Sequence, residues 1–364
     1  MRKRIKRIFD NTEKKPDVII IKNSVEPFID ENFFYATDLK TGLFEGAAAF
    51  LYPDGNINLL VSELEAETAK GAKADILIYK NEKDFFGTIK KRVSKCKNIG
   101  VNFKKITFND LLKIEKHLNK SNFYDISKSF EKTRIIKDEN EIQTIKKACN
   151  IADMVVNKIP NILTDGMFEY ELAAEINYLL QKNGAEKPAF DTISSFGKNS
   201  AEPHYSHGNV ELKKGDIVLC DFGACYNKYN SDITRSFIFG KASKKQKEMF
   251  ETVLIAQRTG LENVSAGALA KYVHKKVEEK INRTQFKGRF IHSTGHSLGM
   301  CVHDGSERIS VNSDLELREN MVFTIEPGIY LPGFGGIRIE DDIIVKKDGF
   351  ELLTRSPKEL IEIV

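Results

Sequence analysis

The sequence predicts an α+β protein of two domains, because three observations agree. Its 364 residues are enough for two domains with full-sized cores. Residues 1 to about 125 alternate short apolar segments with helical stretches. A charged stretch, Lys132–Glu141, then separates this region from one in which amphipathic helices precede apolar strands. We therefore expect an N-terminal α/β domain over residues 1–128 and a second domain over residues 129–364.

Short apolar segments define the strands expected in the first domain: 18–21, 48–51, 58–61, 76–79 and 99–101. Pro53-Asp-Gly55 is expected to be the hairpin turn between two of them. Helices are expected over 64–72, 84–95 and 107–119. This region has no phosphate loop, metal-ligand constellation or catalytic pairing, and we expect the lone His117 to be exposed on its lysine-rich helix.

Amphipathic helices are expected to open the second domain. In the first of these helices, apolar residues recur at steps of three and four: Ile142, Ile145, Cys149, Ala152, Val156 and Ile159. Pro160 is expected to end this helix. Thr164 or Asp165 is expected to cap the next helix, which Asn183-Gly184 closes. A similar helix, expected to start near Ser265, has a stripe of Leu269, Val273, Val277 and Ile281.

The segment from Asp221 to Asp232 is central to the functional argument. It lies between two apolar runs, 217–220 and 233–239, and its Gly/Asn/Tyr-rich interior is typical of a turn. Folding about the midpoint makes the two aspartates cross-strand neighbours, with Cβ atoms about 4.5–5.5 Å apart. Carboxylates this close repel unless a proton or a cation lies between them. Paired aspartates near turns also cap backbone N–H groups, so the pattern needs support from elsewhere.

Support comes from three later segments. His296 and His303 lie in a glycine-punctuated segment, and Glu326 ends an apolar strand before Pro-Gly. Arg338 and Glu340 share one face of a further strand by its period of two. Four carboxylates and one imidazole in apolar or glycine-rich contexts suit two hard-to-borderline divalent ions.

In order, these motifs are Asp-(x10)-Asp, Gly-His-x-x-Gly-x-x-x-His, Glu-Pro-Gly and Arg-x-Glu. This order resembles the pita-bread metallopeptidases, which include Xaa-Pro dipeptidases (prolidases), aminopeptidase P and methionine aminopeptidases. The region before residue 129 resembles the creatinase/prolidase N-terminal domain, with Glu31–Thr37 similar to its signature. The resemblance covers nearly the whole chain. It implies a C-terminal pita-bread domain and a non-catalytic N-terminal domain that helps to close the active site and mediates homodimer contacts.

The resemblance also implies the roles of the metal ligands. Asp221 would bind one metal only, Asp232 and Glu340 would bridge two metals, and His296 and Glu326 would hold the second. Manganese, cobalt, iron and zinc all suit these donors. Each carboxylate on its own could equally be a surface charge or a helix cap.

Further catalytic roles follow from the same resemblance. Glu326 would also pass a proton to the leaving amine, and His303 would stabilise the tetrahedral intermediate. His204 would contact the substrate's peptide group, although His207 is a histidine of equal chemical type nearby. Arg338 would orient a ligand carboxylate. Tyr330 could contribute a hydroxyl near the site. His274 and His292 are expected to have structural roles.

Two positions depart from the family pattern and concern substrate fit: Ser297, where glycine is common, and Asp304, where glutamate is common.

The N-terminal domain and the spacing 340 − 326 = 14 resemble prolidases more than methionine aminopeptidases. The resemblance therefore implies metal-dependent hydrolysis of small peptides with proline in the second position. The alternatives are an Xaa-Pro aminopeptidase acting on longer peptides and a catalytically inactive pita-bread protein that binds peptides or proteins. Creatinase-like hydrolysis without metal is disfavoured, because all five ligand positions are filled.

Composition and charge exclude several other classes. A net charge of +4 gives no case for a nucleic-acid partner, and the basic run Met1–Arg7 is expected to be a helix with a solvated face. No apolar run approaches the roughly 20 residues of a membrane span, and no signal peptide is recognised. Five cysteines without a C-x-x-C pair argue against a zinc ribbon and fit a reducing cytoplasm. Cys220 and Cys225 are expected to be structural.

Overall fold

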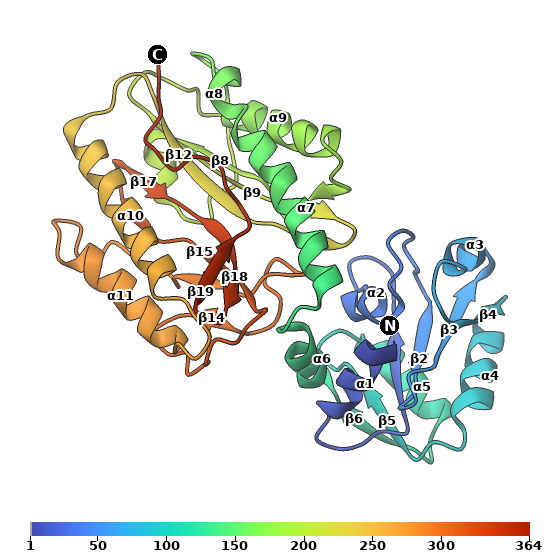
Figure 1. Cartoon of the computed structure of the whole chain (residues 1–364). Helices are drawn as coiled ribbons and strands as arrows, with labels where there is room; N and C mark the ends of the chain where they lie inside the picture. The colour runs from blue at the N-terminus through green and yellow to red at the C-terminus, as the bar shows by residue number, and fades with distance from the viewer. Residues whose placement is uncertain (1) are drawn as a thin grey trace. The chain divides into compact units, whose positions relative to one another are not determined.

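The structure is a computed structural model that describes residues 2–364 (Figure 1). The chain forms two compact units, one ending at Arg134 and the other beginning at Ile135. This boundary lies inside the charged stretch Lys132–Glu141. No helix among residues 2–364 has the length and apolar character needed to cross a membrane.

The first unit is built on a mixed six-stranded sheet in the order β4-β3-β2-β1-β5-β6. Its strands are β1 (Val18–Lys22), β2 (Ala48–Leu51), β3 (Ile57–Ser62), β4 (Asp75–Tyr79), β5 (Asn98–Val101) and β6 (Asn122–Asp125). β1, β2 and β3 pair antiparallel, whereas β4, β5 and β6 join by parallel pairing. The five predicted strands and the hairpin turn are confirmed. β6 was not predicted, because its polar ends leave only two hydrophobic residues, Phe123 and Tyr124, for a pattern.

Helices accompany the sheet of the first unit: α1 (Arg2–Asp10), α2 (Glu31–Thr37), α3 (Ala66–Ala69), α4 (Glu82–Val93), α5 (Phe108–His117) and α6 (Ser127–Arg134), with a short 3-10 turn at Glu63–Glu65. Asn81 and Thr107 cap α4 and α5 with their side-chain oxygens. The expectation that His117 is exposed was wrong. Its ring is half-buried and stacks on Phe86 with centroids 4.4 Å apart, because α4 packs beside α5.

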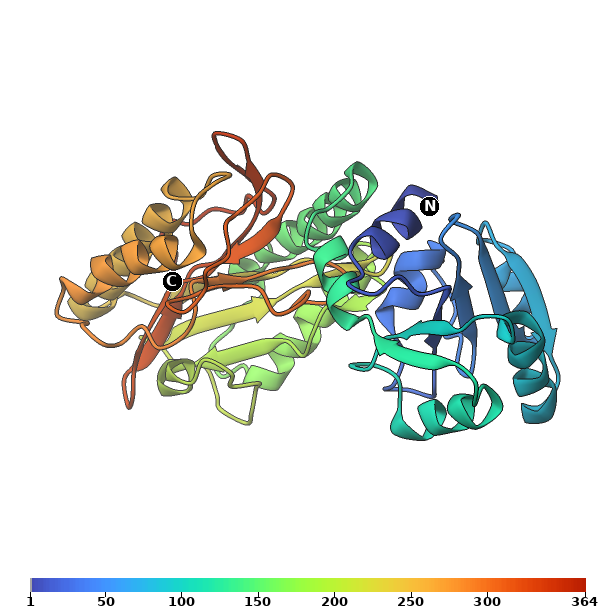
Figure 2. The same cartoon turned by 90° about the horizontal axis from the view of Figure 1, so that it is seen from below.

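Small sheets and two pairs of long helices make up the second unit. Its helices are α7 (Glu139–Val156), α8 (Ile159–Ile162), α9 (Glu169–Lys182), α10 (Lys244–Glu262) and α11 (Ala270–Asn282). The largest sheet has the order β20-β12-β9-β8. Its strands are β8 (Ile193–Phe196), β9 (Ile217–Phe222), β12 (Ile233–Phe239) and β20 (Glu362–Ile363). In both views the strands lie between the green helices α7 and α9 and the orange helices α10 and α11 (Figures 1 and 2).

The remaining strands form smaller sheets. They are β7 (Lys187–Pro188), β10 (Ala224–Tyr226), β11 (Tyr229–Asn230), β13 (Gly295–His296), β14 (Arg308–Ile309), β15 (Val322–Ile325), β16 (Gly328–Leu331), β17 (Gly335–Arg338), β18 (Asp341–Lys346) and β19 (Gly349–Leu352). β15 pairs with β18 and β16 pairs with β17, so the segments that carry Glu326 and Glu340 lie side by side.

Apolar stripes of the helices seal this unit. Every residue of the predicted α7 stripe is buried. Its last three residues, Ala152, Val156 and Ile159, pack with α9 against β8, β9 and β12, and Ile159 already belongs to α8. Its first three residues pack in a separate cluster with residues of β11, β15 and β18. The stripe of α11 is also buried, except that Leu269 is 41% exposed because it precedes the first helical turn. Three further expectations were wrong or incomplete. α7 ends at Val156 and Pro160 lies in the first turn of α8, where its missing N–H costs nothing. α9 begins at Glu169, beyond the expected caps, and α10 was not predicted.

Candidate metal centre

All eight predicted site residues line one cavity of about 650 Å³ in the second unit: His204, Asp221, Asp232, His296, His303, Glu326, Arg338 and Glu340. Their elements are far apart in the sequence. Asp221 lies in β9, Asp232 directly precedes β12, and His296 lies in β13. Glu326 directly follows β15, Arg338 ends β17, and Glu340 directly precedes β18. His204 and His303 lie in segments outside the strands. The fold therefore brings every predicted residue to a single site.

Asp221 and Asp232 are diagonal rather than direct neighbours, so this part of the prediction was wrong. Asp221 pairs with Thr234, and Asp232 lies two residues earlier on the same face. The reason is that residues 224–230 form their own hairpin, β10–β11, instead of a simple turn. Gly223 makes this possible, because a Cβ there would lie 1.8 Å from the carbonyl oxygen of Ser231.

His296 lies between two of the carboxylates. Its Nε2 is 3.5 Å from Oδ2 of Asp232 and 3.5 Å from Oε1 of Glu326. Its Nδ1 lies 3.3 Å from the carbonyl oxygen of Ser297, which suits an Nδ1–H donor and leaves a lone pair on Nε2. Burial, with a smaller contribution from His303, lowers the pKa of His296 to about 3. The imidazole is therefore neutral, which is the form that binds metals.

Three of the carboxylates, those of Asp232, Glu326 and Glu340, are too buried to stay charged without a cation. Burial and the neighbouring carboxylates raise the pKa of Asp232 and of Glu340 well above the ordinary value. Burial also raises the pKa of Glu326 to about 7, although the Arg338 guanidinium opposes the shift. Ligand atoms of Asp232, His296 and Glu340 lie within 4.8 Å of one another.

Asp221 gives a direct test of whether divalent ions fit. Its Oδ1 is buried and has no hydrogen-bond partner among residues 2–364. Buried carboxylate oxygens are normally paired, so this atom lacks a partner that a cation would provide. Together with the acid cluster and the neutral imidazole, this orphaned oxygen makes the donor set fit hard-to-borderline divalent metals.

Arg338 connects the carboxylates from behind. Its guanidinium donates to Oδ2 of Asp221 at 2.5 Å and, through Nε, to Oγ1 of Thr234 at 3.0 Å. Thr234 in turn donates to Oε2 of Glu340 at 2.6 Å. Arg338 therefore positions one carboxylate directly and a second through a hydroxyl. Its Nη1 donates to the hydroxyl of Tyr330 at 2.8 Å.

Tyr330 and His292 support this guanidinium. Tyr330 does not line the cavity, and burial raises its pKa to about 12, so its hydroxyl stays protonated. Nε2 of His292 lies 2.9 Å from that hydroxyl. Burial, with the Arg338 charge as the next cause, lowers the pKa of His292 to about 3. His292 also lines the cavity, whereas His274 does not.

The two histidines expected to face substrate are exposed at the cavity. The rings of His303 and His296 are 4.1 Å apart and nearly perpendicular, and Nδ1 of His303 is 3.4 Å from Nη2 of Arg308. His204 lines the cavity, whereas His207 does not and instead lies 3.2 Å from the carbonyl oxygen of Thr192. The structure thus separates two histidines that the residues alone left equivalent.

Arg308 is a cavity residue that sequence reasoning missed. It lies five residues after His303, and this spacing from a candidate site histidine is the signal that could have drawn attention to it. Cys301 also lines the cavity, whereas Cys220 and Cys225 are buried away from it. Asp304, which departs from the family pattern, is buried and pairs with Nζ of Lys137 at 3.1 Å.

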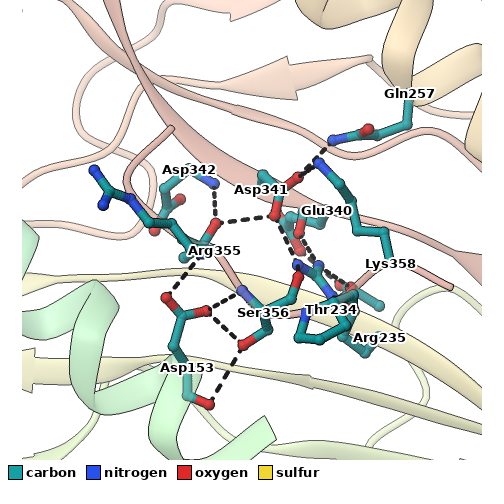
Figure 3. Close-up of polar contacts among 12 residues, drawn as sticks. Asp153, Thr234, Arg235, Gln257, Glu340, Asp341, Asp342, Arg355, Ser356 and Lys358 are labelled. Atoms are coloured by element: carbon teal, nitrogen blue, oxygen red, sulfur yellow. Dashed lines mark hydrogen bonds and ion pairs between the residues drawn. The ribbon is translucent and has the colours of Figure 1, made fainter. Parts of the chain in front are cut away.

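Asp341, next to Glu340, faces away from the cavity and anchors the strand from behind. It accepts hydrogen bonds or ion pairs from Arg235 (2.8 Å), Gln257 (2.7 Å) and Lys358 (2.5 Å), as Figure 3 shows. It also accepts from the Thr354 hydroxyl at 3.1 Å. Alternate residues of a strand face opposite ways, so this cluster fixes the backbone that presents Glu340.

The fold and this donor set define a metallopeptidase of the pita-bread class. The chain belongs to metallopeptidase family M24, because residues 143–347 match the model of that family. Residues 4–136 match the creatinase/prolidase N-terminal domain. The resemblance drawn from the motifs is therefore confirmed.

Similar proteins cover the whole chain. An Xaa-Pro dipeptidase of Pyrococcus horikoshii is 38% identical over 99% of this chain and 99% of its own length. One of Pyrococcus furiosus is 37% identical over 92% of this chain and 97% of its own length. The crystal structure of an X-Pro aminopeptidase from Thermotoga maritima superposes with a TM-score of 0.91 at 33% identity, covering 98% of this chain and 99% of that one. The prolidase from P. horikoshii gives 0.89 at 36% identity, covering 99% and 100%.

Stability of the metal-free protein is expected to fall as pH rises. The Glu326 carboxyl titrates near 4.5 in an unfolded chain and at about 7 in the fold, so the folded state holds the proton more tightly. The resulting stabilisation is complete below pH 4.5 and is lost as pH rises to about 7; Asp232 and Glu340 shift in the same direction.

Thermal unfolding between pH 4.5 and 7.5, with EDTA and with Mn²⁺, measures this effect. Mn²⁺ should restore the melting temperature most strongly near pH 7, because it binds the ionised site. A metal-free protein that is more stable at pH 7 than at pH 5, with no response to Mn²⁺, would contradict these electrostatics.

Proposed function

We propose that this chain is an Xaa-Pro dipeptidase that uses two divalent metal ions. The observation that carries the proposal is the convergence of four carboxylates and one neutral imidazole in one cavity, with an orphaned oxygen on Asp221. Two relatives similar over nearly the full chain are named Xaa-Pro dipeptidase, which supports the same activity here.

The metals would be held by Asp221, Asp232, His296, Glu326 and Glu340. When bound, such ions polarise the scissile carbonyl and make water nucleophilic near neutral pH. Arg338 orients Asp221, because its guanidinium donates to that carboxylate in a buried setting.

Glu326 is proposed to move the proton. It reaches the cavity from the end of β15, and the Thr324 hydroxyl, 3.2 Å from its Oε1, fixes its orientation. A carboxyl with a pKa of about 7 can both take a proton from water and give it to a leaving amine. Cleavage needs this donor, because the nitrogen of the scissile bond has to gain a proton as the C–N bond breaks; before proline that nitrogen leaves as a secondary amine.

Positioning of the substrate is proposed to fall to the exposed residues of the cavity. His303 and His204 can donate N–H groups to the oxygen of the scissile carbonyl and to the peptide group. Arg308, beside His303, supplies a cation that would bind the terminal carboxylate of a dipeptide. A cation that lines the same cavity as the metal ligands favours a short substrate.

An Xaa-Pro aminopeptidase acting on longer peptides is the second candidate, because the T. maritima structure with that name superposes at a TM-score of 0.91. Turnover of Met-Pro, Met-Pro-Ala and Met-Ala by the Mn²⁺- or Co²⁺-loaded protein separates the candidates. The proposal predicts cleavage of Met-Pro, much weaker cleavage of Met-Pro-Ala and none of Met-Ala. A preference for the tripeptide would favour the aminopeptidase, and equal turnover of Met-Ala would overturn the proline specificity.

The proposal also includes a homodimer. Size-exclusion chromatography with light scattering should give twice the mass of one chain. A mass equal to that of one chain would contradict it.

A further inference from the structure

Glu169, the first residue of α9, carries a buried carboxylate that the proposed reaction does not use. The residue is 0% exposed. Among residues 2–364, no lysine, arginine or histidine forms an ion pair with it. A buried carboxylate without a cation is costly, so its hydrogen bonds have to compensate for the lost water.

Four hydrogen bonds reach this carboxylate, two to each oxygen. Oε1 accepts from the backbone N–H of Phe196 at 2.7 Å and from Nδ2 of Asn199 at 3.0 Å. Oε2 accepts from the hydroxyl of Tyr205 at 2.8 Å and from the backbone N–H of Gly208 at 3.0 Å. The acceptor capacity of one carboxylate is therefore fully used.

All four donors belong to one segment, residues 196–208, which begins at the last residue of β8 and contains the 3-10 turn η2 (Gly197–Ala201). The first and the last residue of this segment both donate their amides to Glu169, so the carboxylate closes the segment into a loop. Nδ2 of Asn199 also lies 2.9 Å from the Tyr205 hydroxyl, which links the two side-chain donors.

His204 is carried by this closed segment. It is exposed and lines the metal cavity, and no hydrogen bond from another of residues 2–364 holds its imidazole. Its neighbour Tyr205 is one of the four donors to Glu169. The placement of the imidazole therefore depends on the backbone of the segment. Glu169 holds that backbone at both of its ends, and the Gly336 amide, which donates to Oγ of Ser200, holds it at η2.

We propose that Glu169 is a positioning residue that holds segment 196–208 so that His204 faces the substrate. The inference rests on the proposed function, in which His204 contacts the peptide group. An amide cannot replace the carboxylate fully. A glutamine has one acceptor oxygen, and its NH₂ group would face a backbone N–H, either of Phe196 or of Gly208, that cannot turn away.

Glu169→Gln keeps the volume of the side chain and tests the charge and the acceptors. We expect kcat/KM for Met-Pro to fall roughly 10- to 100-fold, because a displacement of about 1 Å can cost 10²-fold. Metal content should be unchanged, and amides of residues 196–208 should exchange with deuterium faster than in the wild type. Glu171→Gln is the matched control, because Glu171 lies on the same helix and its side chain accepts, among residues 2–364, from the Phe168 amide alone. Its activity should stay within twofold of the wild type.

A double-mutant cycle with His204→Ala separates positioning from general destabilisation. If Glu169 acts through His204, adding Glu169→Gln to His204→Ala should lower kcat/KM by less than about twofold. Kinetic losses that multiply in the double mutant, or a fall in the metal content of Glu169→Gln alone, would overturn the proposal.

Deuterium exchange separates a failure of the positioning role from a failure of the proposed function. A wild-type protein that cleaves no Xaa-Pro peptide refutes that function, whereas unchanged exchange of residues 196–208 in Glu169→Gln refutes the positioning role.

Discussion

Replacing Asp232 with asparagine is expected to lower kcat on Met-Pro by about 10³-fold or more, because metal-ion catalysis supplies several kcal/mol of transition-state stabilisation. Asparagine keeps the shape of the side chain but removes the charge from the centre of the cluster. Asp232 lies near both His296 and Glu340, so its loss affects every cation that the cavity can hold. Bound metal should fall from two ions per chain to one or none, as measured by mass spectrometry of the acid-digested protein.

Asp165→Asn is the control for this substitution. Asp165 is exposed, lies in the same unit and does not line the cavity, so activity and metal content should match the wild type. Undiminished activity of Asp232→Asn would remove Asp232 from the metal centre.

Replacing Asp341 with alanine is expected to lower the free energy of unfolding by about 3–5 kcal/mol, the usual cost of removing one partner of a buried ion pair. Asp341 is 1% exposed at its side chain and faces Arg235, which is 4% exposed. Without the carboxylate, the Arg235 guanidinium loses its anionic partner, and the Gln257 amide and the Thr354 hydroxyl lose an acceptor. Lys358 is more exposed and can reach water.

Urea unfolding measures this effect. Asp348→Ala is the matched control, because Asp348 lies exposed at the turn of the same β18–β19 hairpin and should change stability by less than about 0.5 kcal/mol. Equal stability of the two variants would show that the cluster behind Glu340 does not hold the strand.

Much of the site could be predicted because its ligands lie in short local patterns. Arg338 and Glu340 are two residues apart and both line the cavity, whereas Ile337 and Ile339 lie in the core, as the period of two predicts. The alternation holds although the predicted strand is interrupted at residues 339–340, between β17 and β18. The apolar stripe of α7 is equally local. Patterns of this kind determine which side of an element a residue occupies.

Register and long-range partners could not be predicted in the same way. The pairing of Asp221 with Thr234 depends on how residues 224–230 fold, and the Gly/Asn/Tyr-rich composition is compatible with either a turn or a second hairpin. The partners of Glu169 lie 27 to 39 residues away. The local sequence is also consistent with a cap at Thr164 or Asp165. The helix instead begins at Glu169, whose carboxylate binds a loop that only the tertiary fold brings near.

Anomalous scattering from a crystal grown with Mn²⁺ would show whether the five ligand residues hold a pair of metal ions. We expect two anomalous peaks in the cavity, each within coordination distance of carboxylate oxygens, with His296 Nε2 bound to only one of them. No peak there, or a peak ligated by other residues, would contradict this expectation.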